Sequence, residues 1–332
     1  MGGGYDPCED RDIPDLLANH DCDSSTRANG IYILDSATGA VLNNFGTERA
    51  VPGRVTVVPA ADSERGTSYA YAADAGGNLY RLSGPAGEPI GQTAPAHWVL
   101  TRIAELGCGD KSDSLCSANR KFLSGPDVVR IPGTERYAVM IGSGDREKPT
   151  AASIAAMSVE NYFYALVDAP GSTEWLDSML ATCNRATLCG DALTRVSIGS
   201  PVLSGHDGDA RGWRMKLRHG EQVVSAALTI ANKVYFNTHL PGAAAANVCR
   251  HGMGVATSYQ LDYRDGSGTV TVMPAGGLLP TPVAGKVVLD DGRLSPFCIG
   301  CGGEKSAIGS GGITLPAYLP RPKVRVYRSV ER

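Results

Sequence analysis

The stretch Tyr69–Ser83 reads YAYAADAGGNLYRLS and predicts a β-hairpin. Its opening residues alternate tyrosine with alanine, which is the period of two that a strand requires. Asp74–Asn78 then combines two glycines with aspartate and asparagine, residue types that tolerate positive φ in a tight turn. Leu79–Leu82 returns as a second strand. A hairpin of this kind is the unit from which propeller blades are built.

Looser copies of this phrase recur along the chain. GIYILDSATG spans Gly30–Gly39, YFYALVDAPG spans Tyr162–Gly171 and SYQLDYRDGSG spans Ser258–Gly268. Each copy joins an aromatic and aliphatic strand to a glycine-containing turn that begins with a polar residue. Degenerate repeats at uneven spacing favour an all-β fold, a modified β-propeller with long insertions, over a regular array.

The composition fits many short strands joined by turns in a single domain. Of 332 residues, 42% are hydrophobic, 41 are glycine and 20 are proline. A net charge of −3 argues against nucleic-acid binding, which needs a concentrated basic surface. No run approaches the ~18 apolar residues of a membrane-spanning helix. We take residues 5–332 as the domain, and residues 1–4 (MGGG) as an artificial start of a piece cut from a longer protein.

Nine cysteines indicate disulfides and therefore an oxidising periplasmic or extracellular compartment. Most of them fall in close pairs, which is typical of bridges that close local loops. The predicted bridges are Cys8–Cys22, Cys108–Cys116 and Cys183–Cys189, with Cys249 joined to either Cys298 or Cys301 and one cysteine left over.

Local patterns predict several further elements. His97–Leu106 has apolar residues at mixed helical spacing and is expected to form a short helix, as is Asp177–Cys183. Val223–Ile230 and Lys233–Thr238 are expected to form another hairpin around the dipeptide Ala231-Asn232.

Two late segments are predicted strands, one with a basic face and one that would close a sheet edge. Trp213–Leu217 alternates cleanly, and its polar positions together with Arg218 form a basic stripe. Such a stripe is typical of a solvated strand face, with partner binding as the alternative. Lys323–Arg328 alternates as a last strand that would remove an open sheet edge.

Seven stretches in order along nearly the whole chain carry a resemblance to a known family. They are GYDPCED (Gly4–Asp10), NGIYILDSATGAVL (Asn29–Leu42), VTVVPAADSERGTSYAYAADAGGNLYRLS (Val55–Ser83), VMIGSGDREKP (Val139–Pro149), YFYALVD (Tyr162–Asp168), GWRMKLRHGEQVVSAALTIANKVYFNTHLP (Gly212–Pro241) and KVRVYRSVER (Lys323–Arg332). Together they resemble the C-terminal domain of the PilY-type type IV pilus proteins.

This resemblance implies a modified β-propeller of about seven blades with quinoprotein-like repeats and long disulfide-tied loops. It also implies a non-enzymatic pilus assembly factor and pilus-tip adhesin that supports pilus biogenesis, surface adhesion and twitching motility. The expected partners are minor pilins of the tip complex and a host or surface receptor. The expected location is the cell surface, at the pilus tip and outer membrane, after export through the periplasm. A von Willebrand A-like region would precede this part of the protein.

The resemblance also implies a calcium loop before the hairpin, with ligands at alternate positions of nine residues. Counting back from Asp74 with the family spacing places the ligand positions at Ala60, Asp62, Glu64, Gly66 (through its carbonyl) and Ser68. Calcium prefers about six to eight oxygen ligands, several of them carboxylates. Because Ala60 offers only a methyl group and Ser68 only a hydroxyl, the prediction is a degenerate site that binds calcium weakly or not at all.

Two chemical alternatives are open at this point. Cys249 and His251, together with Cys298 and Cys301, have the residue types of a zinc site, although the oxidising compartment favours a disulfide. The repeat phrase is also similar to that of propeller dehydrogenases that use pyrroloquinoline quinone. Those enzymes have adjacent cysteines, and no Cys-Cys pair occurs in this sequence. No nucleophile or base constellation is evident either, so we expect recognition through disulfide-pinned loops and no catalysis or cofactor.

Overall fold

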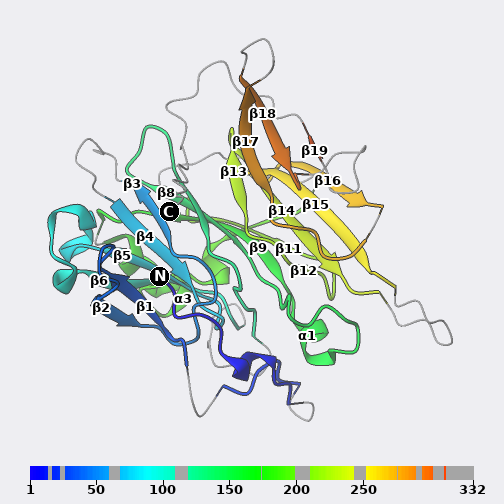
Figure 1. Cartoon of the computed structure of the whole chain (residues 1–332), viewed down its shortest axis with the longest axis horizontal. Helices are drawn as coiled ribbons and strands as arrows, with labels where there is room; N and C mark the ends of the chain where they lie inside the picture. Colours follow the sequence, from blue (N-terminus) through cyan, green and yellow to red (C-terminus); the bar gives the residue numbers. More distant parts are fainter. Residues whose placement is uncertain are drawn as a thin grey trace.

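The computed structural model describes residues 1–13, 17–22, 27–59, 68–108, 119–172, 174–198, 210–242, 252–274, 276–288, 294–301 and 310–311. Strands dominate this part of the chain (Figure 1). The prediction of an all-β fold with a few short helices is confirmed. The finer prediction of about seven blades is not confirmed, because the described residues form five sheets. The predicted last strand Lys323–Arg328 lies outside the described residues.

Helices are confined to connections between the strands. They are α1 (Ile154–Ser158), α2 (Glu174–Asp177) and α3 (Leu180–Cys183), with 3-10 turns η1 (Pro7–Asp10), η4 (Pro85–Gly87), η5 (Ile90–Gln92), η6 (Pro95–His97) and η7 (Gly190–Ala192). The helical prediction for Asp177–Cys183 is therefore confirmed for its second half. None of the helices in the described ranges is long and apolar enough to span a membrane.

The hairpin predicted from Tyr69–Ser83 forms the centre of a four-stranded antiparallel sheet, which we call sheet 2. Its order is β3 (Thr56–Pro59), β4 (Ser68–Ala73), β5 (Asn78–Ser83) and β6 (Val99–Glu105). The turn between β4 and β5 requires glycine at Gly77, where φ is 81° and a Cβ would lie 2.4 Å from the Cα atom of Gly107.

The helix predicted over His97–Leu106 is wrong, since Val99–Glu105 is strand β6. Only Pro95–His97 adopts a short 3-10 turn. The free edge of β5 offers a row of backbone partners, and β6 pairs along it with Leu100 opposite Leu82. This pairing buries Ile103 completely, so tertiary contacts override the local helical spacing.

The other sheets are numbered in chain order. Sheet 1 pairs β1 (Gly30–Leu34) with β2 (Val41–Gly46), and sheet 5 has the order β17 (Val283–Val288), β18 (Leu294–Ile299) and β19 (Ser310–Gly311). Sheet 3 has the order β10 (Thr194–Val196), β11 (Gly212–Lys216), β9 (Tyr162–Asp168), β8 (Tyr137–Gly142) and β7 (Asp127–Arg130). Sheet 4 has the order β12 (Gln222–Val223), β14 (Lys233–Leu240), β15 (Val255–Asp262) and β16 (Gly268–Met273), and β13 (Leu228–Ile230) also pairs with β14.

The repeated phrases have different outcomes. The copy Gly30–Gly39 opens the β1–β2 hairpin and the copy Ser258–Gly268 lies in the β15–β16 hairpin, as predicted. The copy Tyr162–Gly171 supplies strand β9 but no hairpin, because the chain passes into α2 and β9 pairs with β8 and β11 instead. The predicted hairpin around Ala231-Asn232 is confirmed, with positive φ at both turn residues.

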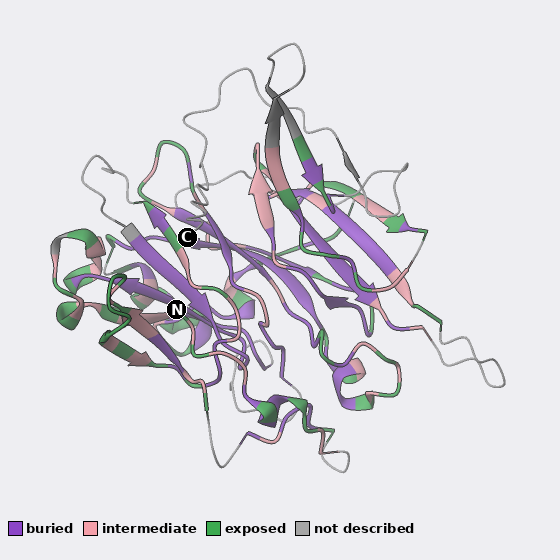
Figure 2. Ribbon diagram, in the orientation of Figure 1, coloured by how far each residue is buried: buried purple, intermediate pink, exposed green. Residues whose placement is uncertain are grey.

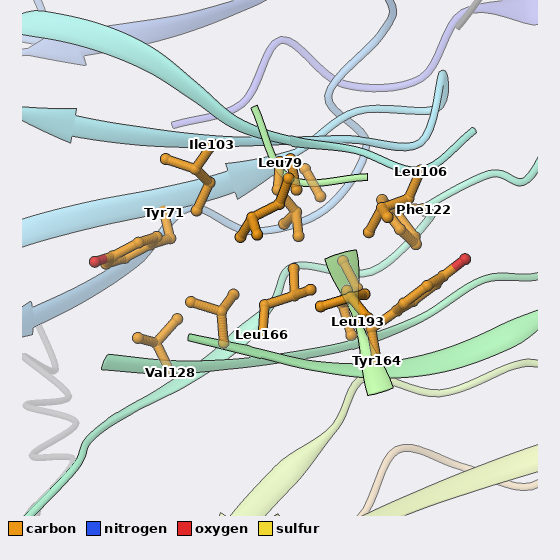
Figure 3. Packing of buried hydrophobic residues seen from close by; sticks show 14 of the residues in the cluster. Tyr71, Leu79, Ile103, Leu106, Phe122, Val128, Tyr164, Leu166 and Leu193 are labelled. Atoms are coloured by element: carbon orange, nitrogen blue, oxygen red, sulfur yellow. The ribbon is translucent and has the colours of Figure 1, made fainter. Parts of the chain in front are cut away.

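Successive sheets pack through their faces in chain order. Ile31 of sheet 1 packs with Ala72 of sheet 2. A large cluster joins sheet 2 to sheet 3, with Tyr71, Leu79 and Ile103 facing Tyr164 and Leu166 (Figure 3). Burial is accordingly concentrated along the strands of the central sheets (Figure 2).

Aromatic rings fill the next interface. Phe163 of sheet 3 stacks on Phe236 of sheet 4 with ring centroids 3.7 Å apart, and Phe236 stacks on Tyr259 at 4.7 Å. Sheet 5 packs on sheet 4 through Tyr235 and Cys298. Each successive pair of the five sheets is thus held together by its own apolar cluster.

The innermost strands of three sheets meet at Asp127, the first residue of β7. Its carboxylate accepts a hydrogen bond from the backbone N–H of Thr229 in β13 and lies 4.0 Å from the guanidinium of Arg54, just before β3. Thr56 of β3 also donates to the carbonyl of Pro126 at 2.6 Å. Strands β3, β7 and β13 therefore gather on one side of the stack, as the inner strands of propeller blades do.

Candidate functional site

The predicted calcium loop lies almost wholly outside the described residues. Only its ends are described: β3 ends at Pro59 and β4 begins at Ser68, and these two residues are paired across the sheet. The ligand positions Asp62, Glu64 and Gly66 fall between them, outside the described ranges. Weak or absent calcium binding at this loop stays a prediction.

Asp74, from which the loop was counted, is a structural residue of the hairpin turn. Its carboxylate accepts hydrogen bonds from the backbone N–H groups of Gly76 at 2.9 Å and Asn78 at 3.0 Å, and from the hydroxyl of Tyr80 at 2.9 Å. The side chain is fully buried, and burial raises its pKa above the ordinary value of 3.8. Asp74 thus shapes the turn from inside.

Two of the predicted disulfides are confirmed. Cys8 is bonded to Cys22 with Cα atoms 5.0 Å apart, and Cys183 is bonded to Cys189 with Cα atoms 5.6 Å apart. Cys108 is also disulfide-bonded. Its predicted partner Cys116 lies outside the described residues, so that pairing stays a prediction.

The prediction that Cys249 pairs with Cys298 or Cys301 is wrong, because Cys298 and Cys301 are bonded to each other. Their Cα atoms lie 5.8 Å apart across a turn at Gly300, where φ is 79°. The tight turn at the end of β18 is what brings two cysteines only three positions apart into bonding range. The same bond removes two of the four ligands of the zinc alternative, and Cys249 and His251 lie outside the described residues.

The Cys8–Cys22 bridge closes a loop that is bound tightly to the rest of the domain. The guanidinium of Arg49 donates to both carboxylate oxygens of Glu9 at 2.7 Å, and both side chains are almost completely buried. Asn19 and Asn119 exchange two hydrogen bonds at 2.9 and 3.1 Å. Among the described residues of this loop, Glu9 and Asn19 are therefore held in the interior by buried polar contacts.

Two buried lysines, Lys121 and Lys148, also donate hydrogen bonds to this loop. The ammonium of Lys121 donates to the carbonyls of Glu9 at 2.6 Å and Asn19 at 2.7 Å, and lies 2.9 Å from the carboxylate of Asp145. Lys148 donates to the carbonyl of Asn19 at 2.8 Å and pairs with Asp12. We call Glu9, Asp12, Arg49, Lys121, Asp145 and Lys148 the buried ionic network. It carries as many acids as bases.

No sequence signal pointed to this network. Its members are scattered over more than a hundred residues and belong to no motif. The one usable hint is the close sequence GSGDREKP at Gly142–Pro149, where charges directly follow a buried strand.

The basic stripe expected to be solvated is only partly so. The side chain of Arg214 is 2% exposed, lies 3.8 Å from the carboxylate of Asp191 and sits over the ring of Tyr162. Lys216 is half exposed and paired with Glu160. The packing of sheet 3 therefore buries Arg214, and the stripe presents no continuous basic surface.

An apolar groove lies between sheets 1 and 2. It has a volume of about 500 Å³ and is lined mainly by aliphatic side chains and a tryptophan, including Ile33, Val55, Val57, Ala70, Leu82 and Trp98. Val57 is 61% exposed, and the guanidinium of Arg54 stands at the groove with its side chain 46% exposed. The volume falls in the range of small-molecule ligand sites.

A smaller groove of about 250 Å³ lies between the outer strands of sheets 3 and 4. It is lined by Ile198, Met215, Lys216, Arg218, Tyr259 and Val272. Glu221 accepts hydrogen bonds from Arg218 at 2.8 Å and from Tyr259 at 2.9 Å. Arg218 and Tyr259 are thus both engaged by Glu221.

Disulfides, face-packed sheets and inner strands gathered on one side define an all-β domain suited to an oxidising compartment. A solved structure, the C-terminal domain of PilY1 from Pseudomonas aeruginosa, is similar to this chain with a TM-score of 0.52 and 17% sequence identity. The likeness covers 81% of this chain and 64% of the PilY1 domain. The sequence resemblance to a PilY-type C-terminal domain is confirmed at the level of the fold. No protein-family model and no curated protein matches the sequence.

Proposed function

We propose that the chain is a non-enzymatic part of a type IV pilus assembly factor, displayed at the cell surface and bound to the minor pilins of the pilus tip. The observation that carries the proposal is the likeness of fold to the PilY1 C-terminal domain, together with the motifs distributed along the sequence. Roles in adhesion to a host or surface receptor and in twitching motility belong to the same proposal.

The arrangement of the domain supports a display role. Most of the aromatic and aliphatic strand residues are committed to the clusters between sheets, which leaves loops and surface grooves for recognition. The disulfides pin connections to this rigid stack, and pinned segments lose less ordering entropy when a partner binds. The apolar groove between sheets 1 and 2 is the surface that we assign to a pilin partner.

The proposal also includes the absence of an enzymatic activity. The quinoprotein dehydrogenase alternative is not favoured, since the observed likeness is to a pilus protein. We propose that the domain turns over no external substrate, because the carboxylates of Glu9 and Asp168 are engaged by arginine and tyrosine side chains.

A binding assay with one groove variant and one matched control tests the assignment. The domain is immobilised and titrated with purified minor-pilin complex. Val57→Asp places a charge in the apolar groove, and Val283→Asp places the same charge at a valine of similar exposure, 56%, that does not line it. We expect Val57→Asp to weaken binding at least about tenfold, which corresponds to roughly 1.4 kcal/mol.

Three outcomes would count against the proposal. Equal binding by both variants would remove the groove from it, and absence of binding by the unaltered domain would remove the pilin partner. Reduction of an electron acceptor by the domain, after addition of quinone cofactor and an alcohol or sugar, would restore the enzyme alternative.

A further inference from the structure

The pair Lys121–Asp145 stands apart from the other ion pairs of the domain. The Lys121 side chain is 0% exposed and that of Asp145 is 5% exposed, with the ammonium nitrogen 2.9 Å from Oδ2. Neither carboxylate oxygen of Asp145 has a hydrogen bond of good geometry from the described residues. A buried carboxylate is ordinarily held by several donors, so this one is unusually bare.

A third buried group completes the cluster. A carboxylate oxygen of Glu9 lies 3.5 Å from the same lysine nitrogen, and the Glu9 side chain is 0% exposed. The bidentate hold of Arg49 fixes this carboxylate in place. The nitrogen of Lys121 therefore has one carboxyl group at contact distance and a second one within reach of its protons.

The environment disfavours the charged forms of both partners. Burial lowers the pKa of Lys121 and raises the pKa of Asp145, although the opposite charges around each oppose these shifts. Proton transfer from the ammonium to the carboxylate gives a neutral amine beside a neutral carboxylic acid. Those are the two reactants of amide formation.

We propose that Lys121 and Asp145 become joined by an intramolecular isopeptide bond, with Glu9 transferring the proton. The Nζ atom attacks Cγ of the protonated Asp145 carboxyl group, which forms the C–N bond. Glu9 accepts a proton from Nζ and delivers it to the departing hydroxyl, the C–O bond breaks, and one water molecule leaves. No oxidant, reductant or cofactor takes part, and Glu9 ends in its starting state.

The charge balance of the network favours this product. Forming the amide removes one positive and one negative charge from the interior, and the pairs Arg49–Glu9 and Lys148–Asp12 remain matched. An ion pair in the interior carries a desolvation penalty that a neutral amide avoids. Lys148 is the wrong nucleophile, because its nitrogen lies 3.8 Å from Asp145 and is bound to Asp12.

The bond would tie together segments that are already neighbours. The N–H of Gly144 donates to the carbonyl of Lys121 at 3.1 Å, just beyond the β7–β8 pairing. A covalent link there would clamp the start of sheet 3 under the Cys8–Cys22 loop. The inference does not depend on the proposed function, although a load-resistant clamp suits a domain displayed on a pilus.

Mass spectrometry of the whole chain, secreted to the periplasm and then reduced and denatured, tests the bond directly. We expect a mass lower than that of the sequence by one water molecule. After tryptic digestion, the peptides Lys121–Arg130 and Tyr137–Arg146 should appear joined, with no cleavage after Lys121. Closure of aspartate to a succinimide loses the same mass but joins no peptides.

Two charge-preserving variants serve as test and control. Lys121→Arg should have the full mass of its own sequence, whereas Lys148→Arg should still lack one water molecule. Glu9→Gln should form the link at least about a hundredfold more slowly, the usual effect of losing a proton-transfer group. An unaltered chain of full mass, or a dehydrated chain whose peptides are not joined, overturns the proposal. Linkage in Glu9→Gln at the unaltered rate overturns the role of Glu9.

Discussion

Replacing Asp168 with asparagine should lower the free energy of unfolding by about 3–5 kcal/mol, the usual effect of breaking a buried ion pair. Asp168 ends strand β9 in sheet 3, and Nη1 of Arg81 in sheet 2 donates to its two carboxylate oxygens at 2.7 and 2.9 Å. The hydroxyl of Tyr71 donates at 2.8 Å. The side chains of Arg81 and Asp168 are only 7% and 1% exposed.

The size of the effect follows from what the substitution leaves behind. Asparagine keeps the shape of aspartate and one acceptor, but the guanidinium of Arg81 would remain buried without a counter-charge. Few groups in the interface between sheets 2 and 3 can compensate, because the surrounding cluster is apolar. Adding Arg81→Met to Asp168→Asn should recover part of the loss, since no uncompensated charge then remains.

Urea unfolding under non-reducing conditions, followed by circular dichroism, measures the loss. Glu160→Gln is the matched control, because it breaks the ion pair with Lys216, in which both side chains are about half exposed. That control should lose less than about 1 kcal/mol. A loss below about 1 kcal/mol in Asp168→Asn, or equal losses in both variants, would refute the reasoning from burial.

The remaining predictions concern disulfides, pH and calcium. Replacing both cysteines of the Cys8–Cys22 bridge with serine should lower the free energy of unfolding by about 3 kcal/mol, and the same change at Cys183–Cys189 by about 2 kcal/mol, because the first bridge closes the longer loop. Thermal unfolding measures both losses, and a larger loss at Cys183–Cys189 than at Cys8–Cys22 would contradict the prediction. Because burial raises the pKa of Asp74, the folded protein retains a proton that the unfolded chain releases, so stability should fall as pH rises above the ordinary value of 3.8. Asp74→Asn should show a flatter profile in unfolding measured from pH 4 upward, and parallel profiles would exclude the effect. Calorimetric titration with calcium should show weak or no binding; tight binding that Asp62→Asn and Glu64→Gln abolish would show that the loop is a working site.

Local chemistry was enough to predict several elements correctly. The hairpin within Tyr69–Ser83 follows from alternation and a turn that only glycine fits at Gly77. The turn at Ala231-Asn232 could also be predicted, because the dipeptide separates two strand segments, and both of its residues have positive φ. The bridges Cys8–Cys22 and Cys183–Cys189 could be predicted because short loops keep their ends close.

The errors fall where a distant segment decides the outcome. His97–Leu106 has a helical pattern of its own, but the open edge of β5 makes it a strand. Arg214 looks like a solvated cation in the alternating strand, yet sheet packing buries it beside Asp191. The error at Cys298 and Cys301 is instead a local one, because the turn at Gly300 had to be known before their bond could be preferred to a bridge with Cys249.

Sequence alone determined the fold class, the opening hairpin and two of the disulfides, because each rests on residue types or on residues close together in the chain. Only the tertiary structure decided which sheet packs on which and that Glu9, Lys121 and Asp145 meet in one buried cluster. The physical reason is that burial and electrostatic coupling depend on distances in space. Residues separated by more than a hundred positions acquire those distances only when the sheets pack.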